Sequence, residues 1–461
     1  MIEIMNPSSS TMIRSDDDIA ARVRYAVFVL FLILCFAGGG GSREDILSLL
    51  YLRPGAILCL AVILALPGRV DWKLIRVPLW LLVGLTALMT IQLVPLPPSL
   101  WTTLPGRAIV AEGAQVLEMA QPWRPISLAP DLTQNSLAAM VIPLTALIGF
   151  AALGATQREN LAIIFIGGGV VSGLLGIMQL SGGSDSLLYT YRITNNQSAV
   201  GLFANRNHQA VMLALSLPML AIAAAHATGD RHVRAVKRGS AAAVSIVLLL
   251  VLLVAGSRAG LVLGGAASVW SIFHYIELRR FLRGERVARQ RSLVLALTAT
   301  AAVGAGLVFL SFARAQSLQR LIGVDMQGEE RLRQLPYVAQ MARDYFPVGA
   351  GFGAFDPAYR IREPLDLLST RYLNHAHNDF LEFVITGGLP ATLLLLAFLL
   401  WWGTTSWSAF RGGRAYGMLG SILVAFLLLA SLVDYPLRVP VLAALFAVAC
   451  GWLCSASKSR S

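Results

Sequence analysis

Polar side chains that could do chemistry fall into four groups, each beside a long apolar stretch of the sequence. The groups occupy residues 201–209, residues 256–260, residues 331–333 together with 349–355, and residues 374–382. An ionisable side chain at the boundary of a membrane is costly unless it is paired or solvated. Each group is therefore a candidate functional site.

The chemistry that these side chains suit is group transfer from a diphosphate. The planar guanidinium of arginine pairs bidentately with phosphate oxygens. A neutral histidine, whose ordinary pKa is about 6.5, accepts a proton from an attacking hydroxyl group. Arginines from separate segments would neutralise the departing diphosphate. We expect no metal and no cofactor, because the predicted outer segments contain no Asp-x-Asp pair and no metal-ligand spacing.

Each group also has an ordinary explanation when it is taken alone. An arginine at a helix end, such as Arg258, often only extends to the lipid headgroups. A hydrogen bond to the backbone explains His375 or His377 as well as catalysis does. The glycine-rich turn at residues 349–353 is a weak indication of a phosphate site. Only convergence of the groups in space favours the functional interpretation.

The elements that must position these groups are membrane-spanning helices. The chain has 461 residues, of which 56% are hydrophobic and 13% charged, and a mean hydropathy of +0.67, which excludes an ordinary soluble fold. The net charge is +12, but Lys and Arg cluster between apolar runs as in cytoplasmic loops, so we expect no nucleic acid partner. The four cysteines lie inside apolar runs and form no disulfide framework.

About twelve apolar stretches are long enough, or nearly so, to cross a bilayer. We therefore expect an all-α fold, a polytopic transmembrane helical bundle of about 12 spans within residues 25–456. The stretches are residues 25–41, 55–67, 77–93, 137–153, 161–180, 210–225, 241–255, 259–276, 293–310, 380–402, 418–432 and 439–454.

Basic residues set the expected orientation, since Lys and Arg in short loops stay on the cytoplasmic side. Residues 1–24 then form a cytoplasmic N-terminal tail and residues 457–461 a cytoplasmic C-terminal tail. Residues 311–379 form a large periplasmic loop. Apolar side chains recur at helical spacing through residues 331–345, which predicts that the loop holds one or two amphipathic helices lying over the bundle.

Three of the motifs resemble those of the O-antigen ligase and polymerase family of bacterial envelopes. They are Asn374 to Glu382 followed by Gly-Gly-Leu-Pro, the segment at residues 346–355, and Gly201 to His208. The resemblance covers residues 198–440 and implies a helical bundle of the membrane glycosyltransferase type. It also implies transfer of a glycan from undecaprenyl diphosphate to a hydroxyl acceptor, without a metal, at the periplasmic face of the inner membrane.

The resemblance also implies roles for single residues. His377, just before Asn378, matches the histidine that activates the acceptor hydroxyl. Arg206, Arg258 and one of Arg331 and Arg333 match the arginines that hold the diphosphate. The expected supporting residues are Asn205, His208, His375, Asn378 and Glu382. Asp434 and Arg438, on either side of Pro436, are expected to be structural.

Several functions remain open at this point. Transfer of a finished polymer to lipid A core would make the protein a ligase, whereas addition of repeat units to a growing glycan would make it an O-antigen or exopolysaccharide polymerase. A protein glycan transferase is a third possibility. A transporter is the alternative from another class, but transporters usually place ionisable sites near the bilayer midplane within repeated halves. The predicted spans here are almost free of charge at their centres.

Overall fold

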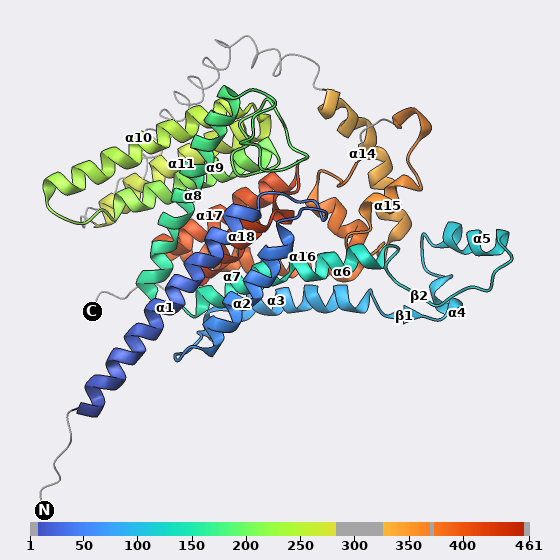
Figure 1. The fold of residues 1–461 in the computed structure, drawn as a ribbon, viewed down its shortest axis with the longest axis horizontal. Coiled ribbons are helices and arrows are strands. Elements are labelled where there is room, and N and C mark those ends of the chain that lie inside the picture. The colour runs from blue at the N-terminus through green and yellow to red at the C-terminus, as the bar shows by residue number, and fades with distance from the viewer. Residues whose placement is uncertain (1–7, 283–325, 369–372, 456–461) are drawn as a thin grey trace, which may run out of the picture.

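The computed structural model describes residues 8–282, 326–368 and 373–455, and these form a helical bundle (Figure 1). One two-residue antiparallel pair, β1 (Pro95–Leu96) with β2 (Arg124–Pro125), is the only sheet among the described residues. The helices before it and around it are α1 (Ser8–Gly38), α2 (Leu49–Ala65), α3 (Trp72–Ile91), α4 (Pro98–Trp101), α5 (Ala108–Val116), α6 (Pro130–Ala139), α7 (Val141–Ala151) and α8 (Ala155–Ser181).

The later part of the chain is also helical. Its elements are α9 (Arg206–Ala225), α10 (Arg231–Ala255), α11 (Arg258–Leu282), α14 (Met326–Tyr345), α15 (Phe355–Arg360), η1 (Leu365–Leu367), α16 (Asp379–Arg411), α17 (Ala415–Ser431), η2 (Pro436–Arg438) and α18 (Pro440–Cys454). The prediction of an all-α polytopic fold is confirmed.

Eight helical segments among the described residues are long and apolar enough to cross a membrane, and α6 and α7 together form one of them. The helices α2, α17 and α18 are apolar but shorter. Each predicted span that falls on described residues overlaps one of these helices. The span predicted at residues 293–310 lies outside the described residues, as do residues 1–7, 311–325, 369–372 and 456–461. The count of twelve spans and the domain boundaries stay predictions.

The helix α9 is the centre of the bundle. It packs against α8, α10, α11 and α17, and 89% of its most apolar 18-residue stretch is buried. Apolar residues surround this helix on all sides, which is the pattern of a core helix. The first residues of α9 carry one of the polar groups, so that group is fixed to the most buried of the eight candidate spans among the described residues.

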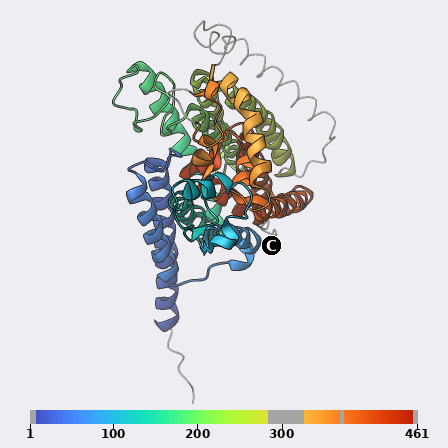
Figure 2. The ribbon, with the colours of Figure 1, turned by 90° about the vertical axis from the view of Figure 1, so that its right-hand side faces the viewer.

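The connections at one end of the bundle are bonded to one another. The backbone N–H of Ala204, before α9, donates to the carbonyl of Gly40, after α1 (3.0 Å), and the N–H of Leu128, before α6, donates to that of Ala350, after α14 (2.9 Å). Figure 1 shows α5, α14 and α15 at this end, and Figure 2 views it face on. Segments far apart in sequence therefore share one polar end of the bundle.

The helix α14 carries its apolar side chains on one face, as predicted for residues 331–345. Val338, Met341 and Tyr345 are buried at spacings of three and four residues, and they form a second, smaller core with Phe355 and Tyr359. The prediction of an amphipathic helix is confirmed. Its packing holds the segment after α14 firmly over the start of α16.

Candidate active site

Three segments meet at the polar end of the bundle, and Asp434 lies at their junction. Its Oδ1 atom lies 3.3 Å from Nδ1 of His377, in the residues before α16. Its Oδ2 atom accepts a hydrogen bond of 2.7 Å from the side chain of Asn207, in the first turn of α9. The Nε2 atom of His208 lies 3.9 Å from Oδ1. One buried carboxylate thus joins two of the four polar groups.

Local capping fixes the position of His377. Asn378 is the N-cap of α16, where its side chain accepts from the N–H of Leu381 (3.0 Å) and donates to the carbonyl of Leu432 (3.1 Å). Asparagine is among the strongest N-cap residues because it satisfies a backbone donor that has no partner within the helix. His377 itself has a φ of 50°, an uncommon conformation for a residue other than glycine. The cap and this turn direct the imidazole towards Asp434.

A second network surrounds His375, which with His377 forms the histidine pair before α16. Arg438 contacts Asp379 (Nε to Oδ1, 3.1 Å) and Glu382 (Nη2 to Oε1, 3.0 Å). Nδ1 of His375 lies 3.0 Å from Oε1 of Glu382, and the N–H of Ala376 donates to Oε2 (2.8 Å). Burial alone would lower the pKa of Arg438, but the Glu382 and Asp379 carboxylates outweigh it and raise that pKa. Glu382 therefore fixes His375 rather than facing solvent.

Tyr435 separates the two networks. Its ring centroid lies 4.5 Å from that of His375, 5.0 Å from that of His377 and 5.3 Å from that of His208. Because the aromatic ring fills the space between the three imidazoles, it restricts their rotation. The three histidines singled out in the sequence are therefore brought together around one side chain.

The structure places Arg206 and Arg258 at neighbouring helix starts. Gly256 ends α10 in the left-handed conformation (φ 67°), and Ser257 accepts from the N–H of Gly260 in the first turn of α11 (3.0 Å). A Cβ atom on Gly260 would lie 2.3 Å from Cβ of Ala210, one turn into α9. Only glycine permits this approach, which packs the start of α11, where Arg258 lies, against the first turns of α9, which begins at Arg206.

The arginines of α14 are less well connected to the site. Arg333 is exposed on α14, and no hydrogen bond or ion pair joins it to the histidines in the described part of the chain. Arg331 lies in the same helix, but its side chain is outside the described residues. Their role stays a prediction.

The glycine-rich turn after α14 has a structural task. Its N–H groups at Ala350 and Gly351 donate to the carbonyls of Ile385 (2.8 Å) and Thr386 (2.9 Å). These carbonyls are exposed where α16 breaks at Gly388, whose φ of 60° and ψ of −150° are not helical. Because these N–H groups donate hydrogen bonds to the carbonyls that the break leaves without helical partners, they are not arranged to hold a phosphate.

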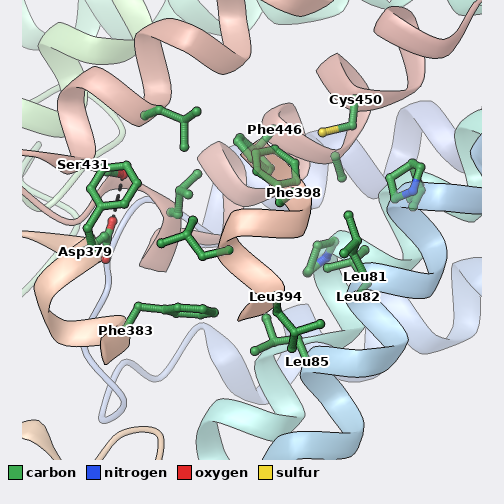
Figure 3. A pocket seen from close by; sticks show the side chains of 18 residues that line it. Leu81, Leu82, Leu85, Asp379, Phe383, Leu394, Phe398, Ser431, Phe446 and Cys450 are labelled. Carbon is green, nitrogen blue, oxygen red and sulfur yellow. Dashed lines mark hydrogen bonds between the residues drawn. The ribbon is translucent and has the colours of Figure 1, made fainter. Parts of the chain in front are cut away.

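Two neighbouring cavities lie near the start of α16. The larger has a volume of about 340 Å³, and His375 and Arg438 belong to its lining. The smaller, about 190 Å³, is lined almost wholly by apolar side chains of α3, α7, α16, α17 and α18, with Asp379 and Ser431 at one edge (Figure 3). The two cavities share five lining residues, Leu82, Leu85, Pro143, Leu437 and Phe446.

Sequence reasoning gave too little weight to the segment between α17 and α18. Asp434, Tyr435 and Arg438 were expected to be structural or were not singled out, yet their side chains contact the histidines or the carboxylates beside them. The available signal was a short polar interruption, Asp-Tyr-Pro-Leu-Arg, between two apolar helices on the predicted outer side.

No group of three or more His, Cys, Asp or Glu that could hold a metal ion occurs among the described residues.

These features define an all-α polytopic membrane protein whose polar side chains converge at one end of its bundle. Residues 243–396 match the family model Wzy_C, O-Antigen ligase. This region of the chain is therefore similar to the O-antigen ligase family, as the motifs indicated. The matched region contains Arg258, His375 and His377, whereas Arg206 and Asp434 lie outside it. No curated protein matches the chain.

Proposed function

We propose that the protein transfers a glycan from an undecaprenyl-diphosphate donor to a hydroxyl group of an acceptor, at the periplasmic face of the bacterial inner membrane. The observation that carries this proposal is the contact between His377 and Asp434, which joins the starts of α9 and α16. The family match supports a ligase-like or polymerase-like membrane glycan enzyme.

His377 acts as the general base in this proposal. Its Nδ1–H donates to Asp434, so that Nε2 is the nitrogen that takes the proton from the acceptor hydroxyl. The carboxylate holds the imidazole in this tautomer and stabilises the imidazolium that forms. The hydroxyl oxygen attacks the anomeric carbon as the bond from that carbon to the diphosphate oxygen breaks. Attack from the opposite face inverts the anomeric configuration.

The arginines stabilise the leaving group. Arg206 and Arg258, with Arg331 or Arg333, neutralise the diphosphate, which already leaves well, so that no strong general acid is required. Holding donor and acceptor in line supplies much of the remaining acceleration. In this scheme the arginines neutralise the charge that a divalent metal would otherwise neutralise.

The acceptor decides between the two proposed outcomes. Transfer to lipid A core makes the protein a ligase, and transfer to a growing glycan makes it a polymerase. A transporter is less well supported, because the polar groups lie at the end of the bundle and not within repeated halves at its middle.

The test is complementation of a gene deletion in the native bacterium with wild type, His377→Ala or Arg258→Ala, followed by separation of lipopolysaccharide and secreted polysaccharide by chain length. Loss of lipid-A-linked ladders with accumulation of lipid-linked polymer in both variants supports a ligase. Loss of long chains with single repeats retained supports a polymerase. Full complementation by both variants at normal membrane levels contradicts the catalytic assignment.

A further inference from the structure

The two cavities are neighbours, and together they make a passage with a polar and an apolar part. They share lining residues, among them Leu82, Leu85 and Phe446, so the chamber of about 340 Å³ borders the apolar slot of about 190 Å³. Figure 3 shows Leu85, Leu394 and Phe398 facing this slot. The polar chamber carries Asn135, Ser136 and Asn374 in its wall. The passage therefore has the amphiphilic character of a lipid-linked molecule.

Arg53 differs from the other basic side chains that line the chamber. Arg43 pairs with Asp45 (2.8 Å) and Arg438 pairs with Asp379 (3.1 Å). Arg53, in the second turn of α2, has no ion pair with any carboxylate of the described chain. It donates a hydrogen bond of 3.3 Å from Nη2 to the carbonyl of Asn135, and its Nε atom is buried without a hydrogen-bond partner.

A partly buried guanidinium with an unsatisfied donor is costly unless an anion completes it. Glu44 also lines the chamber, but it repels an anion less strongly than an ordinary carboxylate does. Burial and the nearby Asp131 and Asp45 raise the pKa of Glu44, so it holds its proton more readily. Asp356 is turned to Arg360, with which it forms an ion pair of 2.8 Å. Among the described arginines that line the chamber, Arg53 is thus the one without a carboxylate partner.

We propose that this passage binds an anionic amphiphile, with Arg53 holding its phosphate or carboxylate group and the apolar slot taking its hydrocarbon chain. The inference rests on the proposed function, since it assigns the place of a lipid-anchored substrate. Two sources share this chemistry, a polyprenyl-diphosphate donor and an acylated glycan-phosphate acceptor. Arg53 lies outside the matched family region, which assigns it no role.

The test is lipid binding by the full-length protein in nanodiscs of phosphatidylcholine, with undecaprenyl diphosphate and hexa-acylated lipid A as separate probes. Arg53→Gln is expected to weaken binding of one probe about tenfold or more, because hydrogen bonds to charged groups are the strong ones, and Arg53→Lys to restore part of it. Leu85→Trp, at the border between the two cavities, should weaken binding of the same probe. The matched controls are Arg69→Gln, in the exposed loop after α2, and Val83→Trp, on an exposed side of α3.

Weakened binding of undecaprenyl diphosphate alone assigns the passage to the donor, and weakened binding of lipid A alone assigns it to the acceptor. If Arg53→Gln binds both probes as well as Arg69→Gln does, the inference is wrong. His377→Ala separates this result from the proposed function, because it should bind both probes normally and transfer no glycan. If Arg53→Gln weakens binding while His377→Ala still transfers glycan, the lipid-binding inference is supported and the catalytic assignment is contradicted.

Discussion

The Nδ1 atom of His377 lies 3.3 Å from Oδ1 of Asp434, although 57 residues separate the two along the chain. Asp434 is 3% exposed, and its other oxygen is held by Asn207. A buried carboxylate in this position orients the imidazole, and it also stabilises the positive charge that forms when the imidazole takes a proton. His377 is therefore better placed to act as a base than a histidine at an ordinary helix end.

Asp434→Asn should reduce glycan transfer by about two to four orders of magnitude, the range that a general base and its orienting carboxylate contribute in other enzymes. The amide keeps the size of the side chain but cannot hold the tautomer in which Nε2 accepts a proton. The measurement is transfer by purified protein in nanodiscs with a saturating lipid-linked donor. Asp185→Asn, in an exposed loop at the same end of the bundle, is the control. Equal activity of the two variants would show that Asp434 has no part in the reaction.

Arg438→Met should destabilise the fold by about 3–5 kcal/mol, because it leaves the buried Glu382 carboxylate and the partly buried Asp379 carboxylate without their cation. Thermal unfolding in detergent measures the change. Arg360→Met removes an exposed ion pair with Asp356 and should cost at most about 1 kcal/mol. Similar shifts in Tm for the two variants would contradict the view that the Arg438 network supports His375.

Gly388→Ala should destabilise the protein by more than about 2 kcal/mol, since the position combines a positive φ with a lack of space. A Cβ atom there would lie 2.2 Å from the carbonyl oxygen of Pro347. Gly403, later in α16, has no atom within 4 Å of its Cβ position, so Gly403→Ala should be neutral or stabilising by up to about 1 kcal/mol. Circular dichroism on heating compares the two. A Tm for Gly388→Ala at or above that of Gly403→Ala would show that the break in α16 is not fixed by this contact.

Much of the fold was predictable because apolar runs of spanning length and clustered basic residues are local signals. The tight turn at Gly256 and the amphipathic α14 followed from residue type and spacing in the same way. The partners of His377 were not predictable, because Asp434 reaches it only through the packing of α16 against α17. The glycine turn at residues 349–353 resembled a ligand loop, but its N–H groups are used by the break at Gly388, which no local pattern reveals.

The proposed orientation predicts opposite labelling of two exposed positions. Leu187, between α8 and α9, is 100% exposed and lies at the end of the bundle that carries the histidines, whereas His232 is exposed at the start of α10 beside a basic cluster. Because such clusters stay in the cytoplasm, Leu187→Cys should react with a membrane-impermeant maleimide in intact cells, and His232→Cys only after permeabilisation. The wild type is the control, since Cys35, Cys59 and Cys450 are buried and Cys454 is partly covered. Labelling of His232→Cys in intact cells, without labelling of Leu187→Cys, would place the candidate site in the cytoplasm and contradict transfer at the periplasmic face.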